Sequence, residues 1–214
     1  ENKKGVSYAR NYGILKSKND WVAFLDSDDE WFKNKIKEQV IFIKKNIEKI
    51  KIVHCNEIWL RNNIHLNQKK KHKKKGEYIF EDCLDACKIS PSSVLINKKL
   101  FLKYGGFDSS FQVCEDYELW LRLTSKEEVG YIEEPLVKKF GGHAGQLSCK
   151  YWGLDRFRIK ALEKLIFKFS LNKYQKKSVI HKILEKIEIL IIGARKRNKE
   201  NFLKIYKKKK SFWI

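Results

Sequence analysis

A short apolar run that ends at an acidic turn constrains the fold more than any other feature of this sequence. Residues 21–25 (WVAFL) have the continuous apolar pattern of a buried strand, and residues 26–30 (DSDDE) stop it abruptly. Helical periodicity precedes this pair over residues 5–18 and resumes over residues 31–49. Helix, strand, acidic turn and helix in this order predict an α/β fold with a parallel sheet.

Local patterns extend this alternation through the first two thirds of the chain. We expect strands at residues 51–55, 57–60, 92–96 and 129–132, and helices at residues 78–87, 98–104 and 114–123. Residues 69–75 are all Lys except His72, and we expect them to form an exposed loop. A second loop is expected at residues 134–135, and residues 140–148 are glycine-rich.

From residue 151 onward the pattern is helical, with apolar stripes on amphipathic helices. A chain of 214 residues is long enough for one well-packed domain with an appended helical piece. We therefore expect a domain over residues 1–148, a C-terminal amphipathic helical region over residues 149–214, and one active site.

Cysteine usage and hydropathy bear on the setting of the protein. The five cysteines are odd in number and lack the paired spacing of metal sites, which favours a reduced, cytoplasmic location. No apolar run approaches the roughly 20 residues needed to span a bilayer. The sequence contains no Met, so residue 1 is not a retained initiator, and we interpret the chain as a fragment.

The formal net charge of +21 creates a field that attracts nucleotides, nucleic acid or anionic lipid. Most of the excess is Lys, spread along the whole sequence, and a solvated basic surface explains it equally well. One alternative is a basic nucleic-acid-binding protein, in particular a metal-dependent nuclease, since the acidic clusters would otherwise repel phosphate. The basic tail suits an anionic membrane surface, although ordinary packing helices also account for its pattern.

The acidic turn after the first strand is the first candidate for chemistry. In an open α/β sheet, ligands bind where strands end, which is where Asp26, Asp28 and Asp29 fall. Carboxylates this close repel one another unless a cation compensates, and hard oxygen ligands suit Mg²⁺ or Mn²⁺. An ordinary acidic turn that caps the next helix is the alternative. A calcium loop of the EF-hand type is disfavoured because Trp31 occupies the position that requires glycine.

Two further candidates have both a chemical and a structural interpretation. Glu115 and Asp116 begin a helix, where acids are favoured by the helix dipole, but a carboxylate there is also well placed to accept a proton from a hydroxyl. His143 lies in the glycine-rich segment and is a metal ligand, a phosphate contact or a surface residue.

The order of these motifs resembles the family 2 glycosyltransferases of the GT-A fold. The matching segments are GVSYARNYGI (residues 5–14), WVAFLDSDDEW (21–31), GGFD (105–108) and CEDYELWLRL (114–123). The resemblance covers about residues 1–148 and implies a Rossmann-like mixed sheet flanked by helices. The family normally begins with a strand and helix that hold the nucleobase, which this chain lacks, so we expect it to bind donor weakly and to be inactive by itself.

The resemblance also implies roles for individual residues. Asp28 and Asp26 match the Asp-x-Asp element, whose second acid meets a Mg²⁺ or Mn²⁺ ion beside the donor diphosphate. Asp116 matches the catalytic base of inverting members, and Glu115 would lie beside the acceptor. The remaining candidates are a late-loop metal or diphosphate contact at His143, a substrate contact at Asp29, and a diphosphate contact at Arg10, for which a helix-surface position is equally compatible.

The implied reaction is transfer of a sugar from a nucleotide-diphosphate donor to a hydroxyl acceptor by inverting displacement. The acceptor would be a polysaccharide, a glycan or a lipid-linked saccharide. Peripheral contact of the basic C-terminal helices with the inner face of the cell membrane is compatible with this activity, and no nucleic-acid partner is expected.

Overall fold

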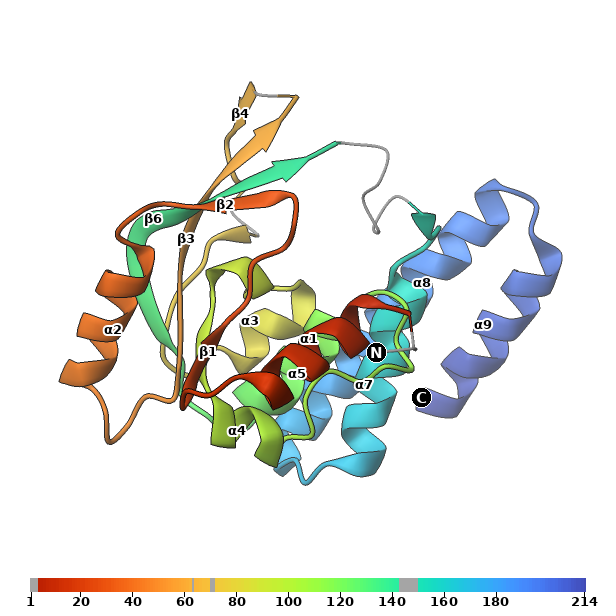
Figure 1. Cartoon of the computed structure of the whole chain (residues 1–214). Helices are drawn as coiled ribbons and strands as arrows, with labels where there is room; N and C mark the ends of the chain where they lie inside the picture. The colour runs from red at the N-terminus through yellow and green to blue at the C-terminus, as the bar shows by residue number, and fades with distance from the viewer. Residues whose placement is uncertain (1–3, 63, 70–71, 143–149) are drawn as a thin grey trace. The chain divides into compact units, whose positions relative to one another are not determined.

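A computed structural model describes residues 4–62, 64–69, 72–142 and 150–214 of the chain (Figure 1). The chain divides into two compact units, residues 1–149 and residues 150–214, and each is described by itself. No helix among the described residues combines the length and the apolar character needed to cross a bilayer.

The first unit is built around a mixed sheet. Its strands are, in spatial order, β1 (Trp21–Ala23), β5 (Leu95–Asn97), β3 (Ile52–Arg61), β6 (Gly130–Gly141) and β2 (Asp29–Trp31), and β4 (Ile64–Leu66) also pairs with β3. Among these strands only β3 and β6 run parallel, and every other pairing is antiparallel. The mixed sheet implied by the resemblance is therefore present, whereas the parallel sheet expected from the local alternation is wrong.

The two central strands are longer than local patterns indicated. β3 is continuous where two strand pieces were expected, and β6 runs through Pro135, where a loop was expected. The pairing shifts register there, from Cys55 opposite Ile132 to Asn56 opposite Pro135. This irregularity leaves residues 133 and 134 outside the ladder, and a proline without an N–H group is tolerated at such a bulge.

The segment after the acidic turn also differs from the expectation. Residues 29–31 form β2, which pairs with residues 137–139 of β6, and helix α2 begins only at Lys35 and ends at Lys45. The helical periodicity of residues 31–49 reflects real amphipathic character. The partner strand is more than 100 residues away in the sequence, so no local pattern reveals it.

Helices cover both faces of the sheet. α2 lies on one side, and α3 (Phe80–Asp85), α4 (Lys98–Lys103) and α5 (Glu115–Thr124) lie on the other (Figure 1). On the α2 side, Ile43 packs with Val53 and Leu95. On the α5 side an aromatic cluster forms the core, with ring centroids 5.4 to 6.3 Å apart between Phe107 and its neighbours Phe24, Phe101 and Trp120.

The remaining elements of this unit are α1 (Val6–Lys16) and the short 3-10 helix η2 (Pro91–Ser93). η2 takes the place of the first half of the strand expected at residues 92–96, and the second half is β5. Pro91 at the first position of η2 has the fixed φ that starts such a turn.

The lysine-rich segment is not wholly exposed, contrary to the expectation. Lys74 is buried, and its Nζ lies 3.0 Å from Glu57 Oε1 on β3. Glu57 also accepts hydrogen bonds from Ser90 and from Trp59 Nε1. Burial alone would raise the pKa of Glu57, but Lys74 and the other neighbours lower it below its usual value, so the carboxylate is ionised beside its partner.

The second unit consists of helices α7 (Asp155–Lys168), α8 (Lys173–Lys196) and α9 (Glu200–Trp213). The Asn172 side chain accepts from Gln175 N and the Gln175 side chain from Asn172 N, a capping box that starts α8. The buried residues recur at helical spacing along one stripe, for example Val179, Ile183 and Ile187.

Candidate active site

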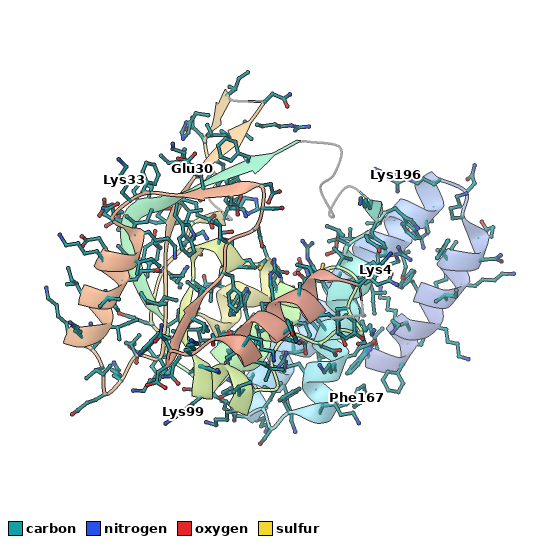
Figure 2. All side chains as sticks on the ribbon, viewed as in Figure 1. Lys4, Glu30, Lys33, Lys99, Phe167 and Lys196 are labelled. Carbon is teal, nitrogen blue, oxygen red and sulfur yellow. The ribbon has the colours of Figure 1, made fainter. Side chains whose placement is uncertain are left out.

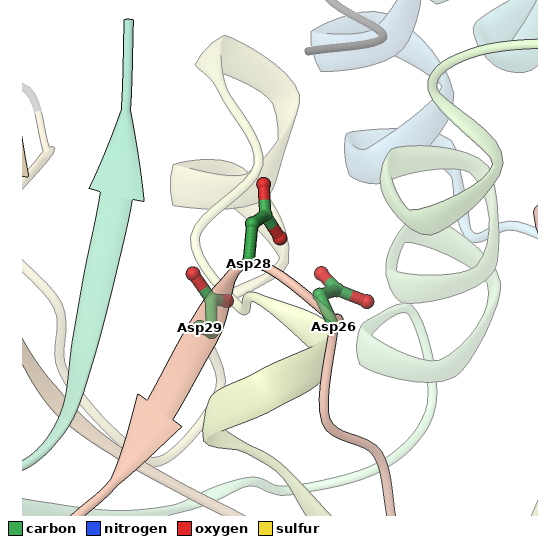
Figure 3. Close-up of side chains that lie close together, drawn as sticks. All are labelled: Asp26, Asp28 and Asp29. Atoms are coloured by element: carbon green, nitrogen blue, oxygen red, sulfur yellow. The ribbon is translucent and has the colours of Figure 1, made fainter. Parts of the chain in front are cut away.

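The acidic turn between β1 and β2 presents three carboxylates together, as Figure 3 shows. Asp26, Asp28 and Asp29 each offer a ligand atom, and these atoms lie within 4.8 Å of one another. Ser92 of η2 shapes the turn, because its Oγ accepts from Asp26 N at 3.1 Å and donates to Asp29 Oδ2 at 2.6 Å. Trp31 Nε1 donates to Ser92 O at 2.7 Å, which ties β2 to the same segment.

The three acids differ in their surroundings. Asp28 is exposed, whereas the side chain of Asp29 is 1% exposed and its Oδ2 accepts from Lys139 Nζ at 2.7 Å. Burial raises the pKa of Asp29, and Lys139 and Ser92 oppose that rise. Among the described residues, the buried Oδ1 of Asp29 has no hydrogen-bond partner. A buried orphan oxygen beside two further carboxylates fits a hard divalent cation such as Mg²⁺ or Mn²⁺.

Arg10 of α1 joins this turn to the second acidic motif. Its Nη2 lies 2.5 Å from Asp26 Oδ1 and its Nη1 lies 2.8 Å from Glu115 Oε1, so one guanidinium holds both carboxylates. The guanidinium carbon also stands 5.1 Å from the centroid of the Phe107 ring. The side chain is only 12% exposed, which makes Arg10 part of the site rather than a residue of the outer helix surface.

Glu115 and Asp116 occupy the first turn of α5. The preceding residue, Cys114, has φ +62°, an uncommon left-handed conformation for a residue with a side chain, and it turns the chain into the helix. Burial, and then the nearby charge of Asp116, raise the pKa of Glu115 to about 7, and the opposing effect of Arg10 is smaller. Glu115 is buried and committed to Arg10, while Asp116 is half-buried and the more accessible of the two.

Two donors hold Asp116 in place. Cys87 Sγ lies 3.2 Å from Asp116 Oδ2 and 3.1 Å from Ile89 O, so its one proton is shared between these acceptors, and Tyr117 N donates to Asp116 Oδ1 at 2.7 Å. Burial, together with the adjacent carboxylate, raises the pKa of Cys87 well above its usual value, so the sulfur keeps its proton and can donate it in a hydrogen bond.

The sequence motifs are also fastened to one another. Asn11 Nδ2 donates to Phe107 O at 2.7 Å, and Phe107 N donates to Asn11 Oδ1 at 3.0 Å. Gly106, at φ +66°, brings the backbone so close that an added Cβ would lie 2.8 Å from Asn11 Oδ1. Arg122 of α5 donates to Gly106 O at 2.7 Å. Residues 10–11, 105–108 and 114–123 therefore form one connected framework around Glu115 and Asp116.

The structure brings most of the expected site residues together. Asp26, Asp28, Asp29, Arg10, Glu115 and Asp116 belong to the connected set described above, whereas His143 lies outside the described residues. Sequence reasoning missed Ser92, Lys139 and Cys87. Lys139 reaches the turn through the pairing of β6 with β2, Ser92 reaches it from η2, and Cys87 is a lone Cys after α3. All three contacts depend on residues distant in the sequence, so nothing in the sequence singles these residues out.

The family of the chain follows from comparison with known proteins. The sequence model of the family described as "Glycosyltransferase like family 2" matches residues 2–175, which is most of the chain. The chain belongs to this family. That membership accounts for the four motifs that the structure gathers around Arg10.

Curated relatives are also named as glycosyltransferases. One from Rickettsia typhi is 30% identical over 138 residues, which cover 63% of this chain and 43% of that protein. Two from Escherichia coli are named UDP-Glc:alpha-D-GlcNAc-diphosphoundecaprenol beta-1,3-glucosyltransferases. WfgD is 29% identical, and the match covers 60% of this chain and 48% of WfgD. WfaP is 30% identical, and the match covers 68% of this chain and 55% of WfaP. The chain thus spans about half the length of these three relatives.

Solved structures support the fold assignment. TarS 1-349 from S. aureus superposes with a TM-score of 0.61 at 14% identity, covering 85% of this chain and 51% of that one. The same protein in complex with UDP-GlcNAc gives a TM-score of 0.60 at 11% identity, with coverage of 97% and 72%. The first unit therefore has the GT-A fold of family 2 glycosyltransferases.

Proposed function

We propose that this protein transfers a sugar from a nucleoside-diphosphate sugar to a hydroxyl group of a glycan or lipid-linked saccharide, with inversion at the anomeric carbon. One observation carries the proposal: Arg10 spans from Asp26 to Glu115 and so places the acidic turn beside the start of α5. A cation-binding turn and an accessible carboxylate in one site are what the transfer of a glycosyl group from a diphosphate requires.

Asp116 is the proposed general base. It is the accessible carboxylate of the pair, and the Cys87 thiol and Tyr117 N hold its two oxygens, which leaves lone pairs for an incoming hydroxyl. Glu115, occupied by Arg10, positions the start of α5 instead of accepting the proton. As Asp116 removes the proton, the acceptor oxygen attacks the anomeric carbon opposite the diphosphate, and configuration inverts in one displacement.

Asp28 and Asp26 are the proposed cation ligands, with Asp29 beside them. A divalent cation held there would neutralise the charge that grows on the departing diphosphate. Arg10 and Lys139 keep positive charge next to Asp26 and Asp29. The turn therefore combines acids for a cation with fixed cations that offset their repulsion.

The names of two relatives suggest the substrates to test first. Both act on UDP-glucose and a diphosphoundecaprenol-linked GlcNAc, so we propose a UDP-sugar donor and an acceptor attached to a diphosphate lipid. Residues 150–214 hold 20 Lys and Arg against 5 Asp and Glu. That excess supports peripheral contact of the second unit with an anionic membrane that carries such an acceptor.

The experiment uses the complete gene product, Mn²⁺, a panel of UDP-sugars and a synthetic GlcNAc-diphospholipid acceptor. The expected result is sugar transfer that stops on addition of a chelator, with a product anomer opposite to that of the donor by NMR. A retained anomeric configuration would exclude the single displacement. Cleavage of oligonucleotides without any sugar transfer would overturn the whole assignment.

A further inference from the structure

The second unit contains a pocket of about 550 Å³ whose lining includes none of the candidate site residues described above. This volume is within the usual range for small-molecule sites. The walls come from the turn before α7 and from α8 and α9, and their apolar members are Trp152, Ile189, Leu190, Ala194, Phe202 and Tyr206. Leu190 and Tyr206 are buried, while Trp152 is 55% exposed and Ile189 50% exposed. The pocket thus has a buried floor and an open, apolar rim.

Aromatic and glycine residues shape this space. Trp152 and Phe202 meet edge to face, with ring centroids 4.8 Å apart. Gly153 and Gly193 also line the pocket, and the absence of side chains there leaves room along α8. At Gly193 an added Cβ would meet only the end of a flexible side chain, Arg197 Nη1 at 3.1 Å.

Positive charge borders the apolar walls. Arg197 and Lys199 belong to the lining, and the guanidinium of Arg156 stacks 3.9 Å from the Trp152 ring centroid. The acid in the lining, Asp155, is already engaged, because its Oδ1 lies 3.0 Å from Arg158 Nη1 and 3.5 Å from Lys186 Nζ. The charge available to a ligand at the mouth is therefore positive.

We infer that this pocket binds the hydrocarbon chain of an anionic membrane lipid, with the headgroup held by Arg197 and Lys199. Apolar walls match the chain and the bordering cations match the headgroup, so both halves of such an amphiphile find complementary surface. Lys196 on α8, labelled in Figure 2, is exposed and precedes the lining residue Arg197 in the sequence, so it adds positive charge at this end of the helix. The inference is independent of sugar transfer and deepens the membrane contact proposed above.

The test titrates the complete protein with monomeric dodecyl phosphate, below its micelle concentration, by isothermal titration calorimetry. We expect saturable binding of one molecule per chain. Affinity should fall roughly fourfold for each CH₂ removed from the chain. Inorganic phosphate should not bind at this site, and the neutral dodecyl maltoside should bind at least fivefold more weakly.

A pocket-filling variant locates the binding. Gly193→Leu should weaken dodecyl phosphate binding at least tenfold, and because Leu favours helix over Gly, the variant should unfold at no lower temperature. His181→Leu adds the same side chain at an exposed position of α8 outside the lining and should leave affinity unchanged. The double variant Arg197→Gln/Lys199→Gln should weaken binding of the phosphate without weakening that of the maltoside.

Two results would overturn the inference: undiminished dodecyl phosphate binding in Gly193→Leu, or equal affinity for the charged and neutral amphiphiles. Sugar transfer to a soluble acceptor serves as the separate readout. Gly193→Leu should keep full transfer activity, so loss of lipid binding and loss of transfer are distinguishable in the same preparation.

Discussion

The two units of this chain differ in how they use charge. Residues 1–149 hold 27 Lys and Arg against 21 Asp and Glu, a net +6, whereas residues 150–214 hold 20 against 5, a net +15. In the first unit, acids at the site are paired with named cations, as in Asp26 with Arg10. In the second, the basic excess has few acids to pair with. The whole-chain charge of +21 is therefore mainly a property of the helical unit and says little about the site.

The largest expected effect is a loss of catalysis that leaves the membrane binding of the second unit unchanged. Asp116→Asn keeps the shape of the side chain but removes its basicity, so transfer in the complete gene product should fall about 10³-fold. Binding to anionic vesicles should not change. Asp20→Asn, at an exposed position of the same unit, is the matched control and should keep full activity. A loss of tenfold or less in Asp116→Asn would point to another base.

Cation binding provides the next test. Asp28→Asn should weaken Mn²⁺ binding by at least about tenfold, because one hard carboxylate ligand is lost. Electron paramagnetic resonance of free Mn²⁺ measures this on the chain itself, without need for activity. Glu30→Gln, in the next strand and paired with Lys138, is the control. Equal Mn²⁺ affinity in both variants would remove the acidic turn from the mechanism.

Removing equal charge from each unit tests the contrast directly. Lys207 and Lys208 are exposed on α9, and replacing both by Gln should weaken binding to phosphatidylglycerol vesicles about tenfold at low salt. Lys44 and Lys45, exposed on α2 of the first unit, give a matched double variant that should change binding less than twofold. Similar losses in co-sedimentation of both variants would show that the membrane senses only total charge.

The smallest expected effect concerns Glu115 and pH. Since its pKa is raised from 4.5 to about 7, the folded protein holds a proton that the unfolded chain releases between these values. Stability from this group therefore falls as pH rises through that window. Between pH 5 and pH 8 the free energy of unfolding should fall by about 1–3 kcal/mol more in the native protein than in Glu115→Gln. This difference corresponds to several degrees in Tm. Parallel pH curves of thermal unfolding for the two proteins would contradict this.

The features predicted correctly from the sequence are those that a local residue pattern determines. The strand at residues 21–23, the turn with Asp26 and Asp28, and the acids at the start of α5 all lie where periodicity and abrupt changes in polarity indicated. These features are set by residues within a few positions of one another, so a local reading is sufficient.

What failed depends on partners distant in sequence. Strand β2 forms because residues 29–31 pair with β6. Lys74 is buried because its ammonium group forms a salt bridge with the Glu57 carboxylate. The same limit hid Lys139, whose contact with Asp29 crosses 110 positions. The local pattern of the lysine-rich segment and of the acidic turn predicts exposure to solvent. In the fold, residues of opposite charge lie beside them, and these tertiary contacts override the local preference.

The guanidinium that touches both Asp26 and Glu115 makes the acidic turn and the start of α5 thermodynamically interdependent. Any ligand that draws Asp26 away from Arg10 alters the field at Glu115, and by reciprocity, protonating Glu115 changes affinity for that ligand by the same factor. Under the proposed assignment, cooperativity between the cation and the acceptor needs no domain movement, only a change of partner by the Arg10 side chain.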